Sequence, residues 1–193
     1  HPKILDMTER QIGPNITFWS SHLIAKPPHT GRPVPWHQDG VEWTNVNGDF
    51  GASVWIALDD VDQASGTMAV IPGWHAKGEL PRIRHTEEHN VFKWDMDSSE
   101  LPANLEEIKV SYNLKAGQAA IHHVMMPHES GPNETHHWRR AIVFRYIAPH
   151  GELGESTYYD YRTKEAMPRT FFLVRGDDIN HVGLPRTPFG DGH

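Results

Sequence analysis

The chain has 193 residues, with 18 basic and 25 acidic side chains and a formal net charge of −7 at pH 7. This length suits one domain with a buried core, and the acidic balance argues against a general binder of nucleic acids or anionic membranes, which needs a basic surface. The chain has no cysteine and 15 histidines. Disulfides, thiolate zinc sites and cysteine nucleophiles are therefore excluded, and imidazole and carboxylate groups are left to hold any metal.

The hydrophobic pattern predicts many short strands and few helices. In chain order we expect a helix over 4–12, strands over 15–25, 52–58 and 67–71, one or two helical turns within 98–108, and strands over 108–114, 118–124 and 141–147. Strands and helices do not alternate regularly, so the pattern indicates an all-β sandwich or barrel. The pattern weakens over 163–193, where we expect an irregular C-terminal extension of one domain that spans 1–193.

The sequence also predicts where the protein is located and which partners it lacks. No apolar stretch reaches the roughly 20 residues of a membrane-spanning helix, so we expect a cytoplasmic protein with neither a membrane nor a nucleic-acid partner. The chain begins at His1 rather than at methionine, and we expect its natural N-terminus to lie upstream. The oligomeric state is left open.

The run Pro35-Trp36-His37-Gln38-Asp39 carries the first sign of chemistry. His37 and Asp39 are two residues apart, so on a strand their side chains share a face and could be two ligands of one metal. Gln38 would then point the other way unless the strand bends. From this triplet alone, a salt-linked pair at a strand end is the more frequent explanation.

A third ligand has to come from a distant part of the chain, and the residues alone leave its identity open. Two histidines and one carboxylate form the facial arrangement of non-haem iron(II) oxygenases, which leaves metal positions for a bidentate co-substrate and for dioxygen. The candidates in later strands and turns are His122, His123, His128, His136 and His137.

A keto-acid co-substrate would also need a cation for its far carboxylate, and arginine can bind a carboxylate through two parallel hydrogen bonds. Arg139 and Arg140 open the strand predicted near 141–147. They lie on opposite faces of that strand, and periodicity does not choose between them. Either could equally be a solvated arginine at a strand end.

Five segments, in this order, resemble the phytanoyl-CoA dioxygenase family over about 22–149. Such an ordered set of motifs is far more specific than any one of them. They are His37-Gln38-Asp39, the run ASVWIALDD over 52–60, Gly66, the turn IPGWH over 71–75, and His128-x-Ser130-Gly131-Pro132-Asn133 with Arg139. The resemblance implies a double-stranded β-helix (jelly-roll) fold, with Fe(II), the co-substrate 2-oxoglutarate and O2.

The resemblance also assigns roles. It implies that His37, Asp39 and His128 bind the metal, and that Arg139 and Ser130 hold the far carboxylate of 2-oxoglutarate. The carboxylate at Asp39 favours hydroxylation, since related halogenases have a small residue at that position.

Further residues are expected to line the pocket. Trp55 matches a tryptophan that lines the co-substrate site in the family, and His22 stands where a family side chain touches 2-oxoglutarate. Trp43 and Gln38 are candidate substrate contacts, and the inward-facing member of the pair His122–His123 is a candidate to support the metal site. In the family, helices precede the first strand, and we expect most of them to be absent from this chain.

The function expected from the resemblance is an Fe(II)- and 2-oxoglutarate-dependent dioxygenase. It would hydroxylate an unactivated C–H bond of a small-molecule substrate and release succinate and CO2. The alternatives are a cupin-like metal-dependent enzyme or sensor that does not use 2-oxoglutarate, and an inactive binding module of the same fold.

Overall fold

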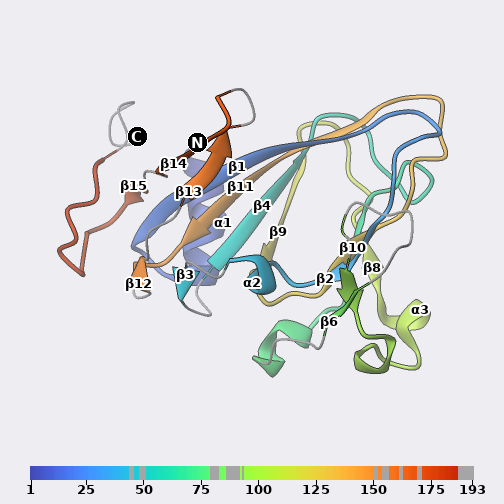
Figure 1. The fold of residues 1–193 in the computed structure, drawn as a ribbon, viewed down its shortest axis with the longest axis horizontal. Coiled ribbons are helices and arrows are strands. Elements are labelled where there is room, and N and C mark those ends of the chain that lie inside the picture. The colour runs from blue at the N-terminus through green and yellow to red at the C-terminus, as the bar shows by residue number, and fades with distance from the viewer. Residues whose placement is uncertain are drawn as a thin grey trace.

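Two antiparallel β-sheets make up most of the fold (Figure 1). The structure is a computed structural model that describes residues 1–43, 46–47, 51–78, 83–85, 92, 94–149, 152–153, 157–160, 163–168 and 171–186. The five-stranded sheet has the order β15-β1-β11-β4-β9 and contains β1 (Ile16–Lys26), β4 (Gly51–Ala57), β9 (Ala119–His123), β11 (Arg139–Ile147) and β15 (Phe172–Arg175).

The second sheet is smaller and has the order β2-β10-β5-β8. Its strands are β2 (Val34–His37), β5 (Met68–Val70), β8 (Val110–Ser111) and β10 (His128–Ser130). Three two-stranded ribbons complete the strands: β3 (Val46–Asn47) with β12 (Glu152–Leu153), β6 (Ile83–His85) with β7 (Trp94–Met96), and β13 (Thr157–Asp160) with β14 (Glu165–Pro168). The predicted all-β fold with a jelly-roll core is confirmed.

Helices are few within the described ranges. They are α1 (Pro2–Ile12), α2 (Asp39–Glu42), α3 (Leu105–Ile108) and the 3-10 turns Trp74–Lys77 and Ser98–Glu100. In α1, Pro2 stands in the first turn, where its missing N–H costs nothing, and Gly13 ends the helix with φ 89°. Its buried residues Leu5, Thr8 and Ile12 are three and four apart and so share one face. Within these ranges, every helix is too short or too polar to cross a membrane.

The two faces of the large sheet have different roles. On one face, α1 packs against β1, β4 and β11 in a core that includes Leu5, Ile16 and Val54. On the other face, Trp55, Ala141 and Val143 pack with Met68 and Val70 of the small sheet. The space between the sheets holds a pocket of about 830 Å³, whose lining comes from both sheets. From β11, alternate side chains of one face line this pocket, namely those of Arg139, Val143 and Arg145.

Most predicted elements are confirmed to within about two residues, with two corrections. The strand expected over 108–114 is reduced to β8, since residue 108 ends α3 and Leu114 makes only an isolated bridge to Val61. The irregular extension expected over 163–193 is wrong for its described part, because β14 and β15 lie there and β15 pairs with the edge of β1. That long-range pairing leaves no local sequence signal. Residues 169–170 and 187–193 lie outside the described residues.

Candidate metal centre and co-substrate pocket

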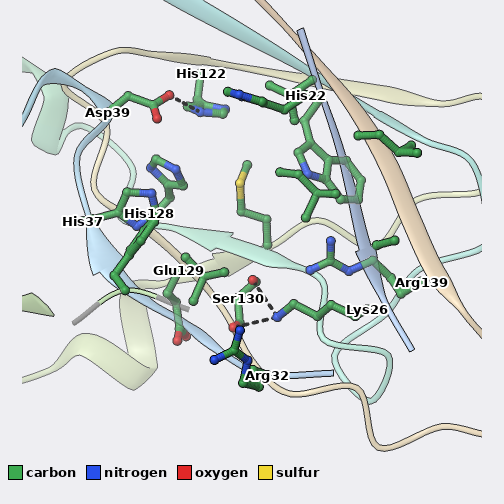
Figure 2. Close-up of a pocket in the computed structure, with 18 of the residues that line it drawn as sticks. His22, Lys26, Arg32, His37, Asp39, His122, His128, Glu129, Ser130 and Arg139 are labelled. Carbon is green, nitrogen blue, oxygen red and sulfur yellow. Dashed lines mark hydrogen bonds and ion pairs between the residues drawn. The ribbon is translucent and has the colours of Figure 1, made fainter. Parts of the chain in front are cut away.

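Three candidate metal ligands converge at one end of the pocket. His37, Asp39 and His128 each offer one nitrogen or oxygen atom, and these three atoms lie within 4.8 Å of one another. All three side chains are buried. Figure 2 shows both imidazole rings side by side, with the Asp39 carboxylate near them. Two nitrogen donors and one oxygen donor with pocket space beside them fit an iron(II) ion.

The three ligands are positioned by three different elements. His37 is the last residue of β2 and Asp39 is the first of α2, so the chain turns between them instead of continuing as one strand. His128 opens β10 and lies directly opposite His37 in the antiparallel pair of β10 and β2. The ring centroids of these two histidines are 4.0 Å apart.

Hydrogen bonds orient both imidazoles for metal binding. The Nδ1 of His37 lies 2.8 Å from the carbonyl oxygen of Pro35, and that of His128 lies 2.9 Å from the carbonyl oxygen of Met126. A carbonyl only accepts, so each Nδ1 carries the proton and each Nε2 keeps its lone pair for a metal. Burial, with the nearby His37 and His122 rings, holds the pKa of His128 well below its usual value. Burial also lowers the pKa of His37. Both rings are therefore neutral at pH 7, as metal ligation requires.

Asp39 is held as a carboxylate by its neighbours. Ser53 Oγ donates to Asp39 Oδ2 at 2.8 Å, His122 Nε2 lies 3.7 Å from the same oxygen, and Arg145 lies 3.5 Å from Oδ1. Burial opposes the charge of Asp39, but Arg145 and His122 outweigh it and hold the pKa of this carboxyl well below its usual range. Figure 2 marks the contact between Asp39 and His122. His122 is thus the inward-facing member of the pair His122–His123.

A cationic cluster occupies the other end of the pocket (Figure 2). Lys26 Nζ donates to Ser130 Oγ at 2.8 Å and to the carbonyl oxygens of Ser130 and Gly131. Lys26 of β1 lies directly opposite Arg139 of β11 in the antiparallel register of these two strands. Burial, with the charge of Arg139, lowers the pKa of Lys26 to about 7. Two buried cations and a hydroxyl are the groups that would bind a carboxylate.

The structure separates the two arginines between which the sequence could not choose. Arg139 is 1% exposed, donates to the carbonyl oxygen of Gly66, and lies 5.6 Å from the ring centroid of Trp55. Burial lowers its pKa to about 10, so it is charged at pH 7. Arg140 faces away from the pocket, is exposed, and pairs with Asp59 at 2.7 Å. Of the two arginines, Arg139 lines the pocket and Arg140 does not; Trp55 lines it as well.

Of the remaining predicted site residues, His22 and Trp43 line the pocket and Gln38 does not. His22 lines the pocket near His122, where Arg145 contacts its Nδ1. Trp43 also lines the pocket and packs edge-on against Trp19, with ring centroids 4.5 Å apart. Gln38 is not brought to the pocket: its side chain donates to the carbonyl oxygen of Met125. It points away because it follows His37 in extended backbone, with φ −116° and ψ 136°.

Sequence reasoning missed Lys26 and Arg145 as pocket residues. The pocket position of Arg145 could have been predicted from the alternation of side chains, since residues 139, 141, 143 and 145 share one face of β11. Lys26 would have required knowledge that β1 pairs with β11, which the sequence does not contain. Among the other histidines considered, His136 is exposed and pairs with His29, and His123 accepts from the Met125 amide.

The fold and the site together define a class. Two imidazoles and a carboxylate on one side of a jelly-roll pocket are the ligand set of mononuclear non-haem iron(II) proteins. Consistent with this, the family model described as phytanoyl-CoA dioxygenase (PhyH) matches residues 1–141. The chain belongs to the phytanoyl-CoA dioxygenase family. The predicted cofactors Fe(II), 2-oxoglutarate and O2 agree with this membership and with the donor set of the site.

Individual relatives support the same class. The chain is 31% identical to a probable alpha-ketoglutarate-dependent hypophosphite dioxygenase of Stutzerimonas stutzeri, over 98% of this chain and 66% of the relative. It is 29% identical to the peroxisomal phytanoyl-CoA dioxygenase of Homo sapiens, over 76% of this chain and 44% of that protein. Among solved structures, the non-haem monooxygenase ThoJ without ligand superposes with a TM-score of 0.67 and 32% identity, over 92% of this chain and 60% of ThoJ. The chain thus spans between 44% and 66% of the length of these relatives.

Proposed function

We propose that the chain is an Fe(II)- and 2-oxoglutarate-dependent dioxygenase that hydroxylates an unactivated C–H bond of a small molecule. The observation that carries the proposal is the convergence of the donor atoms of His37, Asp39 and His128 within 4.8 Å in the pocket that also holds Arg139. Bound iron would supply the activation of O2, which the protein's own side chains cannot perform.

The protein's part is ligation and orientation. His37, Asp39 and His128 would occupy one face of the metal and leave the pocket side open for the keto-acid end of 2-oxoglutarate and for O2. Arg139 would pair with the far carboxylate, with Ser130 and Lys26 as further donors beside it. Trp55 would close one wall of this site. These roles are supported by the burial of all seven side chains and by the charge that Arg139 and Lys26 place there.

The overall reaction balances with these components. The substrate C–H, O2 and 2-oxoglutarate would give the alcohol, succinate and CO2. One oxygen atom enters the substrate and the other enters succinate. The names of the relatives span a hypophosphite dioxygenase and phytanoyl-CoA dioxygenases, so the family alone leaves the substrate open. The carboxylate at Asp39 supports hydroxylation, because it fills a metal position that a halide would otherwise need.

Oxygen-dependent formation of succinate tests this function. The chain is incubated with Fe(II), 2-oxoglutarate and ascorbate, in air and under nitrogen. Phytanoyl-CoA is the trial substrate for C–H hydroxylation, and hypophosphite, which has P–H bonds instead, tests the activity named for one relative. We expect succinate in air only, and none from His37→Ala. The matched control is His136→Ala, since His136 is exposed and lies outside the pocket. Full turnover by His37→Ala would contradict the ligand assignment. Metal binding without any succinate would favour the cupin-like alternative or an inactive module.

A further inference from the structure

The pocket has two cationic ends on one strand. Arg139 and Arg145 share the pocket face of β11 and are six residues apart, which corresponds to roughly 20 Å along an extended strand. Arg139 lies with Lys26 and Ser130, whereas Arg145 lies 3.5 Å from Asp39. The candidate metal centre therefore lies at the Arg145 end. The proposed site for 2-oxoglutarate accounts for the Arg139 end only.

Arg145 has binding capacity that the protein does not use. Its guanidinium contacts His22 Nδ1 and lies 5.8 Å from the ring centroid of Trp43. Its Nε is buried and has no hydrogen-bond partner among the described residues. A buried donor without an acceptor costs free energy. A ligand oxygen placed there would remove that cost.

The carboxylate beside Arg145 is that of Asp39, 3.5 Å away, and Arg145 would share it with the metal. The charge of Asp39 and the keto-acid carboxylate would offset a divalent metal, and the far carboxylate would pair with Arg139. Among the described residues that line the pocket, the other carboxylate is Glu129, and it lies 3.7 Å from Lys109. In a complex with metal and 2-oxoglutarate, Arg145 would therefore have no lining carboxylate that it does not share with the metal, in a partly buried place where charge interactions are strong.

We propose that Arg145, with His22 beside it, is a subsite for an anionic group of the primary substrate. The substrate class is a small oxyanion, either a carboxylate or a phosphorus oxyanion. This inference rests on the proposed function and adds to it a residue that selects the substrate.

The position of Arg145 also limits the size of the substrate. The guanidinium is 3.5 Å from Asp39, which is itself a proposed metal ligand. An anion bound there lies next to the metal, so the reacting hydrogen is within one or two bonds of the anionic group. A CoA thioester does not meet this condition, because its phosphates are many bonds away from the acyl chain.

Anion binding tests the subsite separately from catalysis. Protein loaded with Ni(II) and 2-oxoglutarate is titrated calorimetrically with hypophosphite and with acetate. We expect the wild-type protein to bind at least one of them, and Arg145→Met to weaken that binding at least tenfold. Arg145→Lys, which keeps the charge, should lose less. The affinity for 2-oxoglutarate should change less than twofold in both variants, which also shows that they are folded. Arg140→Met is the matched control, because Arg140 is an exposed arginine of the same strand.

Three results would overturn the subsite and leave the proposed function intact. The first is no binding of either anion to a wild-type protein that binds 2-oxoglutarate. The second is equal binding of an anion to wild type and Arg145→Met. The third is a loss of 2-oxoglutarate affinity in Arg145→Met as large as that in Arg139→Met, which would assign Arg145 to the co-substrate. Failure of the wild-type protein to bind 2-oxoglutarate at all would instead contradict the proposed function. In that case the anion titration is repeated with Ni(II) alone. The subsite is then supported by weaker anion binding in Arg145→Met than in wild type, and overturned by equal binding.

Discussion

Lys26 lies directly opposite Arg139 in the antiparallel pair of β1 and β11, and both side chains are buried. Two neighbouring cations repel each other and are poorly solvated there. Burial, together with Arg139, lowers the pKa of Lys26 to about 7, and burial lowers that of Arg139 to about 10. Such an arrangement is unfavourable by itself and becomes favourable when an anion is bound. It is consistent with a site for the far carboxylate of 2-oxoglutarate.

Binding of 2-oxoglutarate should therefore take up a proton. Near pH 7 Lys26 is about half charged, and a bound carboxylate would raise its pKa. Above pH 7 the affinity should fall as pH rises, by up to about tenfold per pH unit, because the charged form must be restored before it can pair. Calorimetry at pH 8 in two buffers with different ionisation enthalpies measures this uptake. Lys26→Met should bind more weakly and show a flatter pH dependence, and an equal slope in both proteins would contradict the role of Lys26.

Arg139 and Arg140 offer a matched pair of substitutions. Arg139→Met removes a buried charge from the pocket, and we expect the Kd of 2-oxoglutarate to rise about 10- to 100-fold, as for the loss of a charge-assisted hydrogen bond. Arg140→Met removes only an exposed pair with Asp59, so the Kd should stay within about twofold of wild type. Equilibrium titration of both variants measures the difference. The reverse ranking would show that the two arginines are wrongly assigned.

The metal assignment can be tested with a redox-inert ion. We expect His37→Ala and His128→Ala to weaken the binding of Ni(II) by at least about 100-fold, because even the loss of a group that only supports a ligand costs about 10- to 100-fold. His136→Ala should bind like wild type, since His136 is exposed and lies outside the pocket. Calorimetric titration under nitrogen gives the affinities. Wild-type affinity in His128→Ala would remove this residue from the ligand set.

Alanine substitutions at two glycines distinguish the cost of backbone strain from the cost of a steric clash. Gly66 and Gly117 both have positive φ, at 72° and 85°. A Cβ at Gly117 meets nothing within 4 Å, whereas at Gly66 it would lie closer than 3.0 Å to the carbonyl oxygens of Gly131 and Pro132. We expect Gly117→Ala to lower the free energy of unfolding by about 1–2 kcal/mol and Gly66→Ala by about 1–3 kcal/mol more. Urea unfolding measures both, and equal losses would show that the clash is relieved.

Gly66→Ala should also affect the co-substrate site. The carbonyl oxygen of Gly66 accepts two hydrogen bonds from Arg139, so a shift of this turn would move the guanidinium. We expect weaker binding of 2-oxoglutarate by Gly66→Ala and unchanged binding by Gly117→Ala. The same titration as for Arg139→Met provides the comparison.

Local pattern predicted most of the fold. The long strands β1 and β11 and the helix α1 have strong periodicity and clear ends, such as Gly13 after α1. The strand β15 was missed because it is short and owes its place to pairing with Ile16 and its neighbours in β1. Long-range pairing of this kind is not encoded within a sequence window.

The site was predictable to the extent that it resembled a family. Spacing alone suggested His37 with Asp39, but the choice of His128 as the third ligand depended on the resemblance. The structure supplies a physical reason for that choice, because β10 places His128 opposite His37. Local reasoning failed where a polar side chain enters the pocket through strand pairing, as for Lys26. For Gln38, extended backbone next to His37 turned the side chain away.

In the proposed function, His37, Asp39 and His128 would hold an iron(II) ion that 2-oxoglutarate chelates. The most direct measurement is the visible absorption of the anaerobic protein with Fe(II) as 2-oxoglutarate is added. We expect a charge-transfer band that saturates at one 2-oxoglutarate per chain, appears equally in His136→Ala and is absent from His128→Ala. A wild-type protein that binds Fe(II) and shows no band, or an undiminished band in His128→Ala, would contradict it.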